Sequence, residues 1–143
     1  MKTVEECLKN GRLKKTVMSS DMVRKEINVG REDLNEAEAG LTRDAYKWST
    51  IQAYYGIFHA MRALLFAAGY REESHAALKI AIREVYVDTG KLSENAYRAL
   101  ERGMELRELA DYKATFSADT AIWLVSNGKS ALAEAEKILD SMA

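Results

Sequence analysis

Proline is absent from this 143-residue sequence, and cysteine occurs only once, at Cys7. Without proline, the residue that most strongly breaks helices is missing, which favours an all-helical fold. A single cysteine excludes a disulfide within the chain and a zinc site built from cysteines. Two histidines are too few for a histidine-rich metal site. We therefore expect neither a bound metal ion nor a cofactor.

Long apolar runs and a strong charge of one sign are also missing. No run approaches the roughly 20 residues that cross a bilayer, and residues 1–16 lack the apolar region of a signal peptide. We therefore expect a cytoplasmic protein with no membrane partner. The net charge of −1 provides no overall field that attracts nucleic acid. The basic cluster Arg12, Lys14 and Lys15 is either an arm that faces nucleic acid or, as is usual for short charge runs, a solvated face.

Apolar residues make up 48% and charged residues 30% of the chain, which is typical of a globular domain. The length suits one domain over residues 1–143, with a core that needs no disulfide. Residues 1–20 are the least certain part and are treated as an N-terminal extension, in which a short amphipathic helix is expected.

The most apolar stretch lies between Thr42 and Gly69 and predicts a central helix. Its apolar residues recur at spacings of three and four, which places them on one face of a helix. They are Ile51, Tyr54, Phe58, Met61, Leu65 and Ala68. A second stripe beside them holds Tyr55, His59, Arg62 and Phe66. Thr42 is the expected N-cap and Gly69 the expected C-terminal glycine.

Four further segments, each with a serine cap at its start or a glycine at its end, are predicted to be helices. Helices are expected from about residue 20 to 39, from Ser74 to Gly90, from Ser93 to about residue 110 and from Ser117 onward, with a loop over 111–116. Gly30 is expected to kink or break its helix and Gly128 to be a mild defect. No segment alternates with period two, so no sheet is expected. The fold class is all-α, an up-and-down bundle of four to five principal helices.

The two histidines are candidate ligand contacts. His59 lies at the edge of the apolar face of the central helix, where it is either a satisfied core histidine or an acid/base group. His75 directly follows Ser74 at a helix start, where the helix dipole disfavours a positive charge. No phosphate-binding glycine loop, nucleophile elbow or paired metal-binding motif is present.

Arg107, Asp111 and Tyr112 form the most suggestive cluster. Arg107 continues an apolar line of its helix, and an arginine is costly to bury unless it is paired. Asp111 follows four residues later, within reach on one helix face. The structural interpretation is an ion pair that closes the helix. The functional interpretation is a phosphate-binding arginine held by that carboxylate beside a stacking aromatic.

Three motifs in order resemble the HEPN domain family, in particular its small stand-alone prokaryotic branch. They are the run 53–65, which reads AYYGIFHAMRALL, the pair Ser74-His75, and the run 106–112, which reads LRELADY. The resemblance spans about residue 31 to the C-terminus. It implies a helical bundle that commonly forms homodimers and is often encoded beside a minimal nucleotidyltransferase, with which it acts as a toxin–antitoxin pair. Catalytic members are metal-independent ribonucleases with an arginine followed, after four to six residues, by a histidine.

This chain departs from the ribonuclease motif. The positions where the histidine is expected after Arg107 hold Tyr112, Lys113 and Ala114. The resemblance therefore implies a dimeric binding module, paired with a nucleotidyltransferase, that binds nucleotide or RNA through Arg107, Asp111 and Tyr112. One alternative is a ribonuclease toxin in which His59 or His75 reaches Arg107 across the bundle or the dimer. Another is a purely structural oligomerisation bundle.

Overall fold

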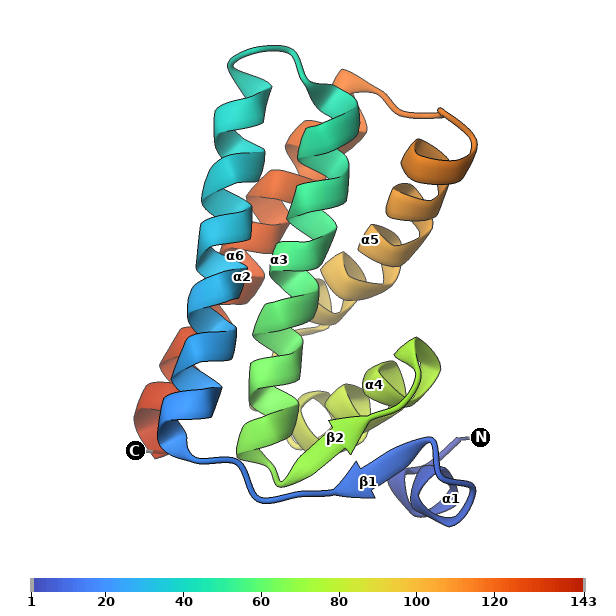
Figure 1. Cartoon of the computed structure of the whole chain (residues 1–143), viewed down its shortest axis with the longest axis vertical. Coiled ribbons are helices and arrows are strands. Elements are labelled where there is room, and N and C mark those ends of the chain that lie inside the picture. The colour runs from blue at the N-terminus through green and yellow to red at the C-terminus, as the bar shows by residue number, and fades with distance from the viewer. Residues whose placement is uncertain (1, 143) are drawn as a thin grey trace.

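Four long helices form the body of the protein, as the computed structural model shows for residues 2–142 (Figure 1). Met1 and Ala143, the two ends of the predicted domain, lie outside the described residues. The helices are α2 (Ser20–Leu41), α3 (Tyr46–Ala67), α5 (Glu94–Tyr112) and α6 (Ala118–Met142). Helix α3 packs against the other three and contributes more buried residues than any of them, as expected for the central helix. The predicted all-α bundle is confirmed.

The shorter elements gather at one end of the bundle. They are α1 (Val4–Lys9), β1 (Leu13–Lys15), β2 (Tyr70–Glu72), α4 (His75–Ile82) and the π-helical turn η1 (Arg83–Val87). Strands β1 and β2 pair antiparallel, with Leu13 opposite Glu72. The expectation of no sheet was therefore wrong, because three-residue strands are too short to show an alternating pattern. Lys14 of the basic cluster lies in this sheet, with its Nζ 3.6 Å from Glu73.

Serine caps set the starts of the helices as predicted. The hydroxyls of Ser74, Ser93 and Ser117 accept hydrogen bonds from backbone N–H groups three residues later. The start of α3 differs from the prediction, because Thr42 is the C-terminal cap of α2 and α3 begins only at Tyr46. Gly69 follows the end of α3 with φ +88°, a conformation that favours glycine.

Three glycines allow α2, α3 and α6 to approach closely. A Cβ on Gly30 would lie 2.8 Å from the carbonyl oxygen of Gly56, and a Cβ on Gly56 would lie 2.5 Å from Leu34 Cγ. A Cβ on Gly128 would lie 2.8 Å from Leu34 Cδ2. Helix α2 runs unbroken through Gly30, so a break at this position is wrong. These glycines are contact positions between helices, and Gly128 is not a defect.

Candidate functional site

Arg107 on α5 faces α3 in a cradle of tyrosines. Its Nη2 donates a hydrogen bond of 2.8 Å to Tyr55 Oη. The guanidinium carbon lies 5.9 Å from the ring centre of Tyr54 and 5.4 Å from those of Tyr55 and Tyr112. These distances are typical of cation–π contacts. Only 18% of the Arg107 side chain is exposed.

The charge on Arg107 is stable in this setting. Burial by itself would lower the pKa of the guanidinium, but Tyr55, Tyr112 and Asp111 act in the opposite direction. The net effect raises the pKa above its ordinary value. Arg107 is therefore a cation throughout the pH range in which the protein is folded.

Most hydrogen-bond donors of Arg107 are unused. A guanidinium has five N–H donors, and within residues 2–142 this one makes a single hydrogen bond, to Tyr55. Its Nε is buried and has no partner among those residues. Asp111 Oδ2 lies 3.7 Å from Nη2, so the predicted pair is present but is longer than a charge-assisted hydrogen bond. The guanidinium therefore keeps its charge, and besides the buried Nε it keeps unused N–H donors on Nη1 and Nη2 that a phosphate would use.

His75 reaches the same side of α3 from the start of α4. Its Nδ1 lies 3.3 Å from Tyr54 Oη, and its ring centre lies 5.2 Å from that of Phe58. Burial raises the pKa of Tyr54, so its phenol stays neutral. The Tyr54 ring thus faces Arg107 while its hydroxyl meets His75. The two predicted site residues share one tyrosine, and within the described residues no direct hydrogen bond joins them.

His59 belongs to a different environment, between α3 and α2. Its Nδ1 lies 2.6 Å from Glu26 Oε1, and its Nε2 lies 3.8 Å from Asp33 Oδ2. Burial raises the pKa of Asp33, although His59 partly offsets this effect. Carboxylates of α2 therefore hold His59, and the structure does not bring it to Arg107.

Sequence reasoning identified Tyr112 but missed the other two rings that contact Arg107, those of Tyr54 and Tyr55. Tyr54 and Tyr55 were assigned to the packing faces of the central helix, and no role was given to Trp48. Tyr54 is 1% exposed, whereas Trp48 is 58% exposed. Trp48 lies one heptad before Tyr55, on the same face of the helix, so the spacing in the sequence could have indicated it. Contacts between Tyr54, Arg107 and His75 join three helices and had no signal in the sequence.

Residues 2–142 hold neither a cluster of metal ligands nor a helix suited to crossing a membrane. No group of three or more His, Cys, Asp and Glu side chains in that range is arranged to hold a metal ion. In the same range, no helix combines the length and the apolarity that crossing a membrane requires.

Comparisons with known proteins match the part of the chain that carries this site. A family model described as the HEPN domain matches residues 23–143. The Methanocaldococcus jannaschii protein named "Putative toxin MJ0605" is 29% identical over 86 residues, which are 60% of this chain and 64% of that protein. A UPF0332 protein of Thermotoga maritima is 29% identical over 82 residues, which are 57% of this chain and 62% of that protein.

A longer match is more distant. The Methanocaldococcus jannaschii protein named "Putative toxin MJ0142" is 22% identical over 121 residues, which are 83% of this chain and 82% of that protein. The matches to the two shorter-aligned relatives span less than two thirds of each relative's length. The matched family region, residues 23–143, includes Tyr54, His75 and Arg107.

Proposed function

Because this chain belongs to the HEPN domain family, we propose that it is a dimeric module that binds the phosphate of a nucleotide or RNA through Arg107. The observation that carries the proposal is a charged, largely buried guanidinium with most of its donors unused. We further propose that the protein acts in the cytoplasm with a minimal nucleotidyltransferase, as one half of a toxin–antitoxin pair. The word toxin in the names of two relatives supports that role.

A phosphate fits the unused capacity of Arg107. Two phosphate oxygens can accept parallel hydrogen bonds from one guanidinium, and such charge-assisted pairs are about twice as strong as neutral hydrogen bonds. Asp111 holds the guanidinium loosely at 3.7 Å, so an incoming phosphate competes with a weak contact. Tyr112 is 71% exposed and lies against the same guanidinium, where it can stack on a base.

The test compares Arg107→Ala with Arg102→Ala. Arg102 lies on the same helix, is exposed and pairs with Glu105 at 2.7 Å, so it controls for the loss of one positive charge. Fluorescence anisotropy with labelled nucleotides and RNA should show at least about tenfold weaker binding for Arg107→Ala, because one lost hydrogen bond to a charged group costs about 1.5–3 kcal/mol. Arg102→Ala should bind like the unmodified protein. Unchanged binding in a folded Arg107→Ala variant, checked by circular dichroism, would refute the proposal.

The assembly is tested separately. Light scattering should give a mass twice the 16.1 kDa of the chain, and a co-expressed minimal nucleotidyltransferase should purify with it. A monomer mass over the working concentration range would contradict the dimer. Failure to recover the nucleotidyltransferase would contradict the paired system without affecting the phosphate site.

A second function, metal-independent RNA cleavage, is favoured by the position of His75. Tyr54 contacts both His75 and Arg107, so an imidazole and a guanidinium share one side of α3. In this reaction the imidazole takes the proton of the 2′-hydroxyl, the 2′-oxygen attacks the adjacent phosphorus, and the 5′-oxygen leaves with a proton from water. Arg107 would stabilise the charge on the phosphorane. His75→Ala should then abolish cleavage while RNA binding persists, and cleavage equal to that of the unmodified protein would exclude this function.

A further inference from the structure

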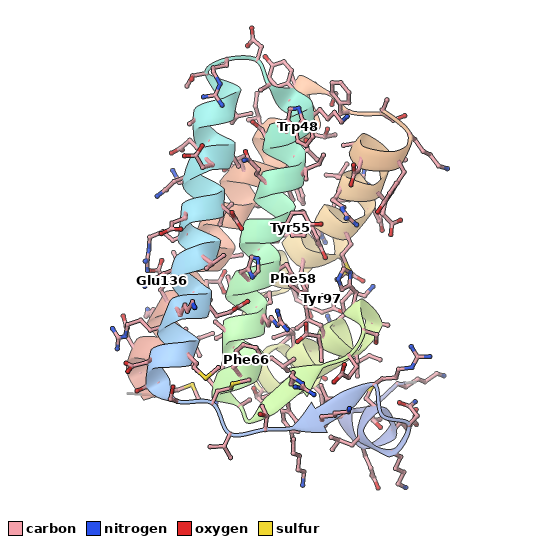
Figure 2. The ribbon with its side chains drawn as sticks, viewed as in Figure 1. Trp48, Tyr55, Phe58, Phe66, Tyr97 and Glu136 are labelled. Carbon is pink, nitrogen blue, oxygen red and sulfur yellow. The ribbon has the colours of Figure 1, made fainter. Side chains whose placement is uncertain are left out.

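Aromatic rings and cations alternate along the side of α3 that faces Arg107 of α5. Figure 2 shows Trp48, Tyr55, Phe58 and Phe66 following one another along this helix. At the beginning of α3, Lys47 Nζ lies 5.0 Å from the centre of the Trp48 ring. Two turns later, the Arg107 guanidinium lies over Tyr55. Such an arrangement resembles the surfaces on which proteins bind single-stranded nucleic acid.

The two ends of this row differ in how their cations are neutralised. Toward the end of α3, Arg62 lies over Phe66, but its Nε is 3.2 Å from Glu72 Oε1. Arg83, the first residue of η1, makes two hydrogen bonds to Glu94, of 3.0 and 2.7 Å. These two cations already have counter-charges, so this end of the row has little to offer a phosphate.

The opposite end is open. Within residues 2–142, Lys47 makes no ion pair, and the Trp48 ring beneath it is 58% exposed. Tyr112, which ends α5 beside the guanidinium of Arg107, is 71% exposed. Helix α3 begins and α5 ends at the same end of the bundle (Figure 1). Trp48 lies one heptad before Tyr55, and therefore on the face of α3 whose Tyr55 contacts Arg107.

We infer that Trp48 stacks on a base that flanks the phosphate bound by Arg107, so that the ligand is a single strand of several nucleotides. This inference rests on the proposed phosphate site. Trp48 precedes Tyr55 by one heptad, which is about 10 Å at a rise of about 1.5 Å per residue. Stacked nucleotides rise about 3.4 Å each along a strand. The interval therefore fits roughly three nucleotides, and Lys47, which directly precedes Trp48, supplies a cation at the outer end of that interval.

The chemistry of this surface suits nucleic acid better than an apolar protein surface. Each unit of a strand presents a flat base and a negative phosphate, which match the exposed indole of Trp48 and the unpaired ammonium of Lys47 next to it. An apolar partner that covered Trp48 would also bury Lys47 without a counter-charge, and such burial is costly. Base–aromatic stacking also tolerates any sequence, because every base has a π-face.

The experiment measures binding as a function of ligand length. Fluorescence anisotropy is recorded with labelled uridine monophosphate and with single-stranded RNA of about two, four and eight nucleotides. Trp48→Ala should bind the mononucleotide normally and the longest RNA about five- to 150-fold more weakly, the range that stacking losses give. Trp48→Phe should recover most of this binding. Trp123→Ala is the matched control, because Trp123 is the other tryptophan and lies partly exposed on α6.

The outcomes separate this inference from the phosphate site. Selective loss of the long ligands in Trp48→Ala, with loss of all ligands in Arg107→Ala, supports both. Normal binding of the long RNA by Trp48→Ala overturns the inference and leaves the Arg107 site intact. A change in mass by light scattering, with all ligand lengths weakened equally, would assign Trp48 to a protein contact and also overturns it. A parallel series with single-stranded DNA shows whether the protein binds RNA or DNA. The inference requires that Trp48→Ala weakens binding of the long form of whichever strand binds.

Discussion

The glycine contact between α2 and α3 yields a sharp prediction about stability. In Gly56→Ala the new Cβ would lie 2.5 Å from Leu34 Cγ, 3.0 Å from the Gly30 carbonyl oxygen and 3.1 Å from the Leu34 nitrogen. Two of these atoms are backbone, so rotating a side chain cannot relieve the overlap. Overpacking of this kind costs about 1–3 kcal/mol, while replacing glycine by alanine inside a helix returns about 1 kcal/mol. Because the backbone atoms cannot move aside, we take the upper part of that range, about 2–3 kcal/mol, and expect a net loss of about 1–2 kcal/mol.

Gly103→Ala is the matched control. Its Cβ would meet Leu124 Cδ1 and Tyr54 Cδ1 at 3.4 Å, which is ordinary contact. The gain in helix propensity should then dominate and stabilise the protein by up to about 1 kcal/mol. Thermal unfolding followed by circular dichroism should therefore shift down by about 2–8 °C for Gly56→Ala and up by about 1–4 °C for Gly103→Ala. Equal shifts, or a stabilised Gly56→Ala, would refute this account of the helix contact.

The remaining predictions concern Tyr86, whose buried hydroxyl donates a hydrogen bond of 2.6 Å to the carbonyl oxygen of Leu64. Tyr86→Phe should lower the free energy of unfolding, measured in urea, by about 1 kcal/mol. Tyr97→Phe is the control and should change it little, because the Tyr97 hydroxyl makes no hydrogen bond within residues 2–142. Equal effects of the two substitutions would contradict a stabilising role for the Tyr86 hydrogen bond. Burial also raises the pKa of Tyr86 to about 12, against about 10 in the unfolded chain. The resulting stabilisation is complete below pH ~10 and is lost as pH rises toward ~12. The free energy of unfolding should therefore fall less steeply above pH ~10 in Tyr86→Phe than in the unmodified protein. Identical pH profiles of the two proteins would contradict this role of Tyr86.

Local chemistry explains which parts of the fold were predictable. Ser74, Ser93 and Ser117 start helices because a hydroxyl that accepts a backbone N–H is a signal within a few residues. The contact between Gly30 and Gly56 depends on how two helices cross, and the sequence alone shows only a costly residue in each helix. Interpreting Gly30 as a break was therefore reasonable from propensity and wrong in three dimensions.

The candidate site divides in the same way. Asp111 lies within one helical turn of Arg107, so spacing was enough to predict their ion pair. The position of His75 depends on where α4 packs, and no pattern in the chain indicates that Tyr54 would bring His75 and Arg107 to one side of α3. The roles predicted for Arg107 and His75 can be tested by the variants described above. The roles predicted for Asp111, Tyr112 and His59 also remain predictions.

The pairing of β1 with β2 affects where this domain can be cut. The family match begins at residue 23, yet β1 (Leu13–Lys15) supplies the hydrogen-bonding neighbour of β2, the strand that carries Glu72 and its contact to Arg62. A protein trimmed to the matched region would lose the partner of β2 and also Val4, Cys7 and Leu13, which are buried in the core, so apolar surface would be exposed. A protein that begins at residue 23, where the family match begins, should therefore aggregate more readily than one that includes β1.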